Sequence, residues 1–226
     1  SKVFKYIRER GIKRFISLIY FKFICKIESL IIKRDKRFEK FYNNYELSKD
    51  KFEIIDVSPI VSKSGLIFKY SKNDLYKIKK ANLDLIVRSG GGILRGEILN
   101  LCPNGIISFH HGDNNVNRGG PAGFWEVFYG YSSTGFIIQR LNEELDGGDV
   151  LYKGFISTSW FYSLNLARLY EISNPSLKIV LENLTSNKDN KFNEEKIPYS
   201  EPLYTIPNFY EITSYVFKTL FRLLKK

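Results

Sequence analysis

The sequence predicts an α/β protein of the Rossmann-like class, with a mostly parallel sheet flanked by helices and with helical extensions at both ends. Short β-branched runs, such as residues 83–88 and 105–110, alternate along the chain with segments of helical periodicity. The 226 residues, 43% of them hydrophobic, can bury a sizeable core. We expect an N-terminal helical segment over residues 1–50, a core over 51–160 and a helical C-terminal extension over 161–226.

The individual elements follow from periodicity and from helix-capping residues. Apolar residues recur at helical spacing over residues 2–34, and a polar linker over 35–50 follows. Asn73 is expected to cap a helix that ends near Lys80, and the run at 83–88 is typical of a strand buried on both faces. The remaining expected elements are a strand over 52–57, a helical turn or two over 93–101, a strand over 105–110, a helix around 124–127 opened by Pro121, strands over 134–141 and 150–157, a helix over 162–184, a polar loop over 185–201 and a basic helix over 211–226.

The formal net charge of +11 has two explanations, and both stay open. One is an anionic partner, such as a phosphorylated small molecule, nucleic acid or an acidic membrane face. The other is a lysine-rich genome, which the abundance of Lys, Asn, Ile, Tyr and Phe also indicates. No RNA-binding fingerprint or zinc-finger spacing accompanies the charge, which disfavours nucleic acid as the partner.

Cys25 and Cys102 lie far apart and outside any CxxC arrangement, which predicts two core thiols and a reducing, cytoplasmic setting. The apolar segment 15–32 is interrupted by Lys22, Lys26 and Glu28, which argues against a membrane-spanning helix. Packing of this segment onto the sheet is the first interpretation. A basic amphipathic helix on the inner face of a membrane is the second.

The candidate site lies at the carboxyl ends of strands, where open α/β sheets bind ligands. The two histidines, His110 and His111, both end the predicted strand over 105–110. Because adjacent strand residues point to opposite faces, and no third ligand has suitable spacing, we expect no metal site. Glycine clusters at 89–92, 118–121 and 145–149 would let the backbone approach a ligand closely. None of them matches a Walker or dinucleotide-binding loop.

In this order, these pieces resemble the folate-dependent formyltransferases, the family of the methionyl-tRNA, glycinamide ribonucleotide and amino-sugar formyltransferases. That family's pattern is a strand before an Ile-Leu-Pro segment, then Asn-x-His, Arg-Gly with Pro, a Thr-Gly strand and Leu-Asp-x-Gly-Asp. The matching segments, within residues 83–157, are Gly92-Ile93-Leu94, Ser108-Phe109-His110, Arg118-Gly119-Gly120-Pro121, Thr134-Gly135 and Leu145-Asp146-Gly147-Gly148-Asp149-Val150.

The resemblance implies transfer of a formyl group from 10-formyltetrahydrofolate to a primary amine. It implies that His110 donates to the oxyanion, that Asp146 orients His110 and helps to remove the amine proton, and that Ser108 holds the third catalytic position. It places the formyl donor against Val87, Arg88, Gly90, Gly91, Gly92, Ile93, Leu94, Leu145, Gly147, Gly148 and Asp149. The residues expected to contact the amine substrate are His111, Asp113, Asn114, Asn115 and Arg118.

The sequence also departs from the family pattern. Ser108 stands where the family has Asn, and Asn114 or Asn115 could supply the missing amide. Arg118 could instead stabilise the fold by capping a loop carbonyl. The chain opens with a helix rather than the family's first strand, so either a strand–helix unit is missing or this subgroup begins differently.

Three functions therefore stay open: a formyltransferase, an inactive formyltransferase-like binding domain, and a hydrolase that releases formate. For the first, an amino sugar is the expected acceptor, because nothing beyond residue 157 resembles the barrel of the transfer-RNA enzymes. The net charge of +11 would suit a nucleotide-linked or lipid-linked sugar. The terminal basic helix is expected to dock on the core, with dimerisation or peripheral membrane contact as the second interpretation.

Overall fold

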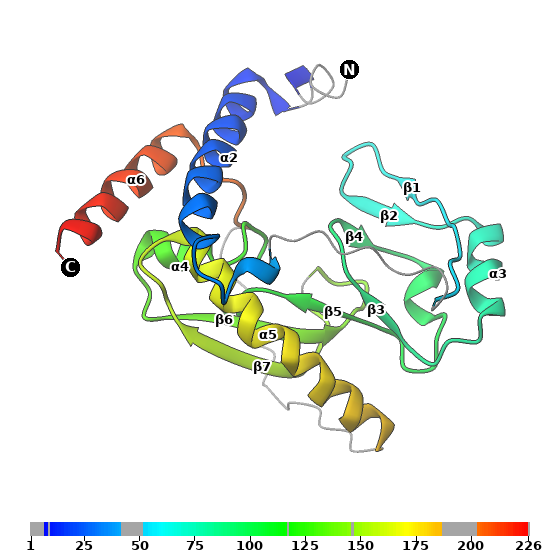
Figure 1. Ribbon diagram of the computed structural model, residues 1–226. Coiled ribbons are helices and arrows are strands. Elements are labelled where there is room, and N and C mark those ends of the chain that lie inside the picture. The colour runs from blue at the N-terminus through cyan, green and yellow to red at the C-terminus, as the bar shows by residue number, and fades with distance from the viewer. Residues whose placement is uncertain are drawn as a thin grey trace.

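The chain forms an α/β fold with two small mixed sheets and flanking helices (Figure 1). The computed structural model describes residues 7–8, 10–41, 52–116, 118–145, 147–186 and 203–225. Its elements are α2 (Ile12–Ile32), η1 (Glu39–Phe41), β1 (Ile60–Val61), β2 (Ile67–Lys69), α3 (Lys72–Lys80), β3 (Ile86–Arg88), β4 (Ile93–Leu94), η2 (Glu97–Asn100), β5 (Ile106–His110), α4 (Phe124–Tyr129), β6 (Ser133–Arg140), β7 (Asp149–Ser157), α5 (Tyr162–Thr185) and α6 (Phe209–Leu224).

The predicted α/β class is confirmed, but the prediction of a mostly parallel sheet is wrong. One sheet has the strand order β1-β2-β4 and the other β3-β5-β6-β7. Only the β2–β4 and β3–β5 pairs are parallel, whereas β1–β2, β5–β6 and β6–β7 are antiparallel. The connection from β6 to β7, residues 141–148, is too short for the crossover that a parallel pair needs.

The first elements of the core along the chain differ from the prediction. Residues 53–59 belong to neither sheet, and the smaller sheet begins instead with β1 at its edge and β2 in its centre. Ser71 rather than Asn73 caps α3, because its hydroxyl accepts the Asp74 N–H at 3.1 Å. β3 is shorter than predicted and lies at the edge of its sheet, which leaves Val87 43% exposed rather than buried on both faces.

Other boundaries shift because of local hydrogen bonds and packing. Residues 93–101 form a short strand followed by a 3₁₀ helix, not a purely helical turn. Gly123, not Pro121, is the N-cap of α4. Asn208 and Glu211 form a capping box, so α6 begins earlier than predicted. Phe38, in the predicted linker, is buried against Ile32 and Phe161. Residues 2–6, 9, 42–50, 187–201 and 226 of the predicted elements lie outside the described part of the chain.

β5 lies between two packed layers. On one face, Ile107 and its neighbour Ile138 on β6 pack against Val180 of α5, which crosses the sheet in Figure 1. On the opposite face, Ile106 packs with Leu75 of α3 and with residues of β4 and η2.

The helices α2, α4, α5 and α6 form a third cluster around Phe21, Phe124, Ile212 and Tyr215. Within it, Cys25 is half-buried and burial raises the pKa of its thiol to about 12, while Cys102 is buried elsewhere; both are free thiols. The prediction of a core thiol is thus confirmed in full for Cys102 and in part for Cys25. No helix among the described residues is long and apolar enough to cross a membrane.

The N-terminus of α5 is capped by side chains from two other helices. Its own N-cap residue, Phe161, offers no side-chain acceptor. The Ser163 N–H donates to Glu28 Oε2 of α2 at 2.8 Å, and the Tyr162 N–H donates to the hydroxyl of Tyr215 of α6 at 2.7 Å. The Tyr215 hydroxyl in turn donates to Glu28 Oε1. These bonds join three helices at one buried point, and burial raises the pKa of Glu28.

Candidate functional site

β5 brings Ser108 and His110 to the same face of the sheet, since side chains two residues apart on a strand share a face. Ser108 is only 7% exposed, and its hydroxyl donates to the Phe109 carbonyl at 3.3 Å. In the sheet, Ser108 pairs with Arg88 of β3 and with Gln139 of β6, and His110 pairs with Ile137. The central strand thus presents a hydroxyl and an imidazole at its carboxyl end, as the sequence predicted.

A buried lysine, which sequence reasoning missed, lies on this same face. Lys153 of β7 pairs with Ile137, which pairs with His110, so these three residues form a row across β5, β6 and β7. The Lys153 ammonium forms an ion pair with Asp113 Oδ2 at 3.2 Å, and both side chains are nearly buried. Simple alternation over 150–157 would place Lys153 on one face with Leu151 and Phe155. A bulge in the β6–β7 pair instead turns Leu151 to the opposite face, where it packs with Ile107 and Val180. Which face of the sheet Lys153 occupies depends on the register of β7 against β6.

The loop after β5 is held against the sheet by this ion pair and by a glycine. A Cβ on Gly135 would lie 2.9 Å from the Asp113 Cβ, so the Thr134-Gly135 motif lets the loop lie directly on β6. Asp113 also accepts the Asn115 N–H at 3.0 Å, which starts a tight turn. Asn114 is buried and Asn115 exposed. Three of the predicted substrate contacts therefore lie together beside His110.

Arg118 connects this loop to the one between β6 and β7. Its Nε donates to the Asn114 carbonyl at 3.2 Å, and its guanidinium forms an ion pair with Glu144 at 3.4 Å. The structure thus gives Arg118 the loop-bracing role that the sequence left open beside substrate binding. The next residues pair with the C-terminal segment: the Gly120 N–H donates to the Tyr204 carbonyl at 3.1 Å, and the Tyr204 N–H to the Arg118 carbonyl at 2.9 Å.

The loop over residues 141–148 is shaped by its glycines and by side chains that bond its backbone. The Gly148 N–H donates to Gln139 Oε1 at 3.2 Å, and a Cβ on Gly148 would lie 2.1 Å from the Arg140 carbonyl oxygen. The Asn142 amide donates to the Gly147 carbonyl at 3.1 Å. Among the residues of this loop that were predicted to contact the formyl donor, Leu145 is half-buried, Gly147 and Gly148 are buried and Asp149 is exposed. Asp146, the predicted partner of His110, lies outside the described residues.

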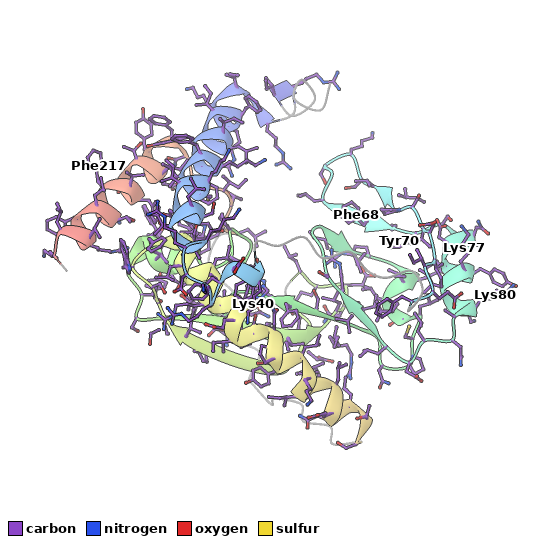
Figure 2. The ribbon with its side chains drawn as sticks, viewed as in Figure 1. Lys40, Phe68, Tyr70, Lys77, Lys80 and Phe217 are labelled. Carbon is purple, nitrogen blue, oxygen red and sulfur yellow. The ribbon has the colours of Figure 1, made fainter. Side chains whose placement is uncertain are left out.

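The segment from Val87 to Leu94 approaches this loop from β3 and β4. Arg88 folds back, and its guanidinium donates to the carbonyls of Gly91 and Gly92 at 2.6 and 2.7 Å. Gly92 has a positive φ, and a Cβ there would overlap the ring of Phe68, which lies on β2 beside β4 (Figure 2). Leu94 is buried in the core, and Ile93 is half-buried.

This segment joins the 141–148 loop just after β4. The Arg95 guanidinium donates to the Asn142 carbonyl at 3.3 Å, and the Gly96 N–H donates to Glu143 Oε1 at 2.8 Å. Val87 points away from the site, because it pairs with Ile107 and so faces the α5 layer. The structure thus brings the two glycine segments close to the strand that carries His110, but it directs the Val87 side chain elsewhere.

His111 lies on the other face from His110. Its ring stacks on Phe109 with centroids 5.4 Å apart, meets Tyr170 of α5 edge-on at 4.7 Å, and hydrogen-bonds Ser173 at 3.1 Å. Burial, with a smaller contribution from His110, lowers the pKa of His111 to about 4. This histidine thus packs the sheet against α5, and its predicted role as a substrate contact has no support from its position.

The position of His111 predicts an acid-sensitive fold. Its ordinary pKa is 6.5, so the unfolded chain takes up a proton as the pH falls below 6.5, while the folded chain resists protonation down to about pH 4. We expect this histidine to lower the free energy of unfolding by about 2 kcal/mol between pH 6.5 and 5. Urea unfolding of the wild type and of His111→Phe, measured across this range, tests it. Equal pH slopes for the two proteins would contradict the assignment.

Neither a metal cluster nor a cavity among the described residues defines the site. The described residues contain no cluster of three or more His, Cys, Asp or Glu side chains arranged to hold a metal ion. A cavity of about 480 Å³ opens among α4, α5 and α6, where Trp160, Arg168 and Arg222 line it. None of the predicted site residues lines this cavity, so its position does not define the candidate site.

Comparison with known proteins gives structural similarity at low sequence identity. No protein-family model matches the chain, and no curated protein matches it. Among solved structures, a sugar N-formyltransferase from a Shewanella species matches with 24% identity and a TM-score of 0.49, over 66% of this chain and 65% of that one. Phosphoribosylglycinamide formyltransferase from Campylobacter jejuni matches with 18% identity and a TM-score of 0.43, over 49% and 59%.

A third structure, methionyl-tRNA formyltransferase from Clostridium thermocellum, matches with 16% identity and a TM-score of 0.44, over 65% of this chain and 67% of that one. The match thus spans less than two thirds of the Shewanella and Campylobacter proteins. These likenesses concern the course of the backbone over part of each chain.

Proposed function

We propose that this protein transfers a formyl group from 10-formyltetrahydrofolate to the primary amine of an amino sugar. The observation that carries the proposal is that three loops are linked to one another around the strand that carries Ser108 and His110, with Arg118 joining the Asn114 loop to the 141–148 loop. β5 carries Ser108 and ends at His110, and Lys153 fixes the Asp113 loop beside this strand. The segment after the glycines at 90–92 bonds the 141–148 loop through Arg95 and Asn142. These are the segments whose order in the sequence resembles the formyltransferases.

The residues present fit a flat, polar formyl donor. A Cβ on Gly90 or Gly91 would meet no other atom within 4 Å, so the backbone here borders open space. The neighbouring 141–148 loop offers backbone N–H and carbonyl groups, and the side chains of the buried Gln139 and the exposed Asn142 hold its backbone. Residues 87–94 and 145–149 would hold the pteridine through such groups. When bound, the donor supplies a formyl carbon on nitrogen that is open to attack.

The side chains of β5 and its loops would then serve the attack of a neutral amine. His110 would donate a hydrogen bond to the oxyanion that develops on the formyl oxygen, the kind of interaction that contributes most to acyl transfer. Asp146 would orient the imidazole and receive the amine proton. The Ser108 hydroxyl, or the amide of the buried Asn114, would position the formyl group where the family has an asparagine.

An amino sugar is the acceptor that the rest of the chain supports best. After the core, the described residues form two helices, α5 and α6, which pack back on the sheet and on α2. The net charge of +11 favours a substrate that carries phosphate, as a nucleotide-linked or lipid-linked sugar does.

Calorimetric titration with 5-formyltetrahydrofolate, a stable folate analogue, tests the proposal. We expect binding in the micromolar range, about −8 kcal/mol, that weakens in Asp146→Asn and is unchanged in Asp84→Asn, an exposed aspartate on the far side of β3. Formyl transfer to amino-sugar acceptors would follow. Absence of binding by a chain shown to be folded would overturn the proposal, and formate release without any acceptor would favour a hydrolase.

A further inference from the structure

The two terminal helices of the described chain expose an unusual amount of apolar surface. On α2, large apolar side chains recur every three or four residues and are each at least 44% exposed: Ile12, Ile16, Ile19, Phe23, Ile27 and Leu30. On α6, a comparable set is 47% to 84% exposed: Phe209, Tyr210, Phe217, Leu220, Phe221 and Leu224. Monomeric proteins rarely leave a contiguous apolar patch of this kind uncovered, so it indicates an interaction surface.

These exposed stripes are separate from the stripes that hold the helices to the core. The buried positions of α2 include Ser17, Phe21 and Glu28, and at 100° per residue they lie opposite the exposed stripe. On α6, the buried Ile212 and Tyr215 lie opposite Phe217 and its neighbours. Figure 2 shows Phe217 on the outer side of α6, away from the sheets. Each helix therefore has one apolar face that is used and one that is not.

The two unused faces meet. The rings of Tyr20 on α2 and Phe209 on α6 lie 5.1 Å apart, and both residues lie at the border of their helix's exposed stripe. Figure 1 shows the two helices side by side at the same end of the molecule. Together they form one surface, which we call the α2–α6 face.

The charge around the α2–α6 face is positive. Exposed basic residues flank the apolar stripes: Lys13, Lys22 and Lys26 on α2, and Lys225 directly after α6. Lys218 is turned toward α4, where its ammonium donates to the Phe128 carbonyl at 3.0 Å. The acidic residues of these two helices are already engaged. Glu28 is buried in the cap of α5, and Glu211 forms the capping box of α6. An anionic surface can therefore approach without meeting an unpaired carboxylate on either helix.

We propose that the α2–α6 face binds an anionic membrane surface as a peripheral contact. Apolar side chains can insert into the headgroup region of a bilayer, while the ammonium groups of the lysines beside them stay at the lipid phosphates. A second copy of the chain fits less well, because a symmetric contact would bring the lysines of both copies together. The proposal is independent of the proposed catalytic function.

Vesicle co-sedimentation of the full chain tests it, with phosphatidylcholine vesicles that contain or lack phosphatidylglycerol. We expect binding only to the anionic vesicles and weaker binding as salt is added. Ile16→Glu is expected to weaken binding by roughly thirtyfold, the loss of one apolar anchor, and Lys22→Ala by about fivefold. Ile172→Glu on α5 is the matched control: Ile172 is 48% exposed and Ile16 49%, both on helices, but Ile172 lies outside the face.

Equal binding to both kinds of vesicle, no binding, or an equal loss in Ile16→Glu and Ile172→Glu would each overturn the proposal. Sedimentation velocity without vesicles tests the alternative, in which a second copy of the chain covers the α2–α6 face. A dimer that Ile16→Glu dissociates, together with no vesicle binding, would assign the α2–α6 face to a second copy. Circular dichroism of each variant ensures that a loss of binding is not a loss of fold.

Discussion

Replacing His110 with glutamine is expected to lower kcat for formyl transfer by about 10²- to 10⁴-fold while leaving KM for the formyl donor nearly unchanged. Glutamine can fill much of the space of the imidazole, but its amide stays neutral and so offers the oxyanion a weaker hydrogen bond than a charged imidazole does. The loss therefore falls on the transition state, where the oxyanion forms, rather than on binding. Steady-state kinetics with saturating donor and a reactive amino-sugar acceptor measure it.

The adjacent histidine provides the matched control. His111 is the same residue type, one position further along, and its side chain packs on the opposite face against Tyr170. At a neutral pH, where both variants are folded, His111→Gln should keep most of the activity. Equal losses in the two variants would place the chemistry elsewhere, because only His110 lies on the face that carries Ser108 and Lys153.

Replacing Glu28 with alanine is expected to lower the free energy of unfolding by about 3 kcal/mol. The change leaves the Ser163 N–H and the Tyr215 hydroxyl without their buried acceptor, and each such loss costs about 1–3 kcal/mol. It also removes the contact by which α2 caps α5. Urea unfolding followed by circular dichroism measures the effect. A loss below about 1 kcal/mol would mean that water replaces the carboxylate.

The Glu28→Gln variant separates the effect of the hydrogen-bond acceptor on stability from the effect of the titratable charge. Burial raises the pKa of Glu28 above its ordinary 4.5, so as the pH rises the unfolded chain releases this proton first. The contribution of Glu28 to the free energy of unfolding therefore decreases as the pH rises from about 4.5 through the raised pKa. Glu28→Gln keeps an acceptor and should remove this dependence. Its sign is opposite to that of His111, so the two can be told apart.

Those parts of the candidate site that depend only on neighbouring residues in the sequence could be predicted. The β-branched run before His110 predicts a strand that ends there, and glycines at 90–92 and 147–148 predict loops. Other features depended on partners far along the chain. Lys153 meets Asp113 only because β7 pairs with β6 in one particular register, and Gly135 is needed only because that loop lies on β6.

Some of the errors had a signal in the sequence. The eight residues between β6 and β7 are too few for a crossover, so this antiparallel pair could have been predicted from the spacing alone. Likewise, strand alternation places His111 opposite His110, which argued against a shared metal and equally against a shared substrate. The α3 cap could not be chosen in this way, because Ser71 and Asn73 are both good caps and only the backbone geometry selects Ser71.

The pairing of Tyr204 with the Arg118–Gly120 segment gives the end of the chain a part in the geometry of the site. The segment leads directly into α6, and it holds Arg118, which braces both the Asn114 loop and the Glu144 loop. The start of α6 is therefore connected, through Tyr204 and Arg118, to two loops of the candidate site. Whatever anchors this helix is therefore expected to steady the loops of the candidate site as well.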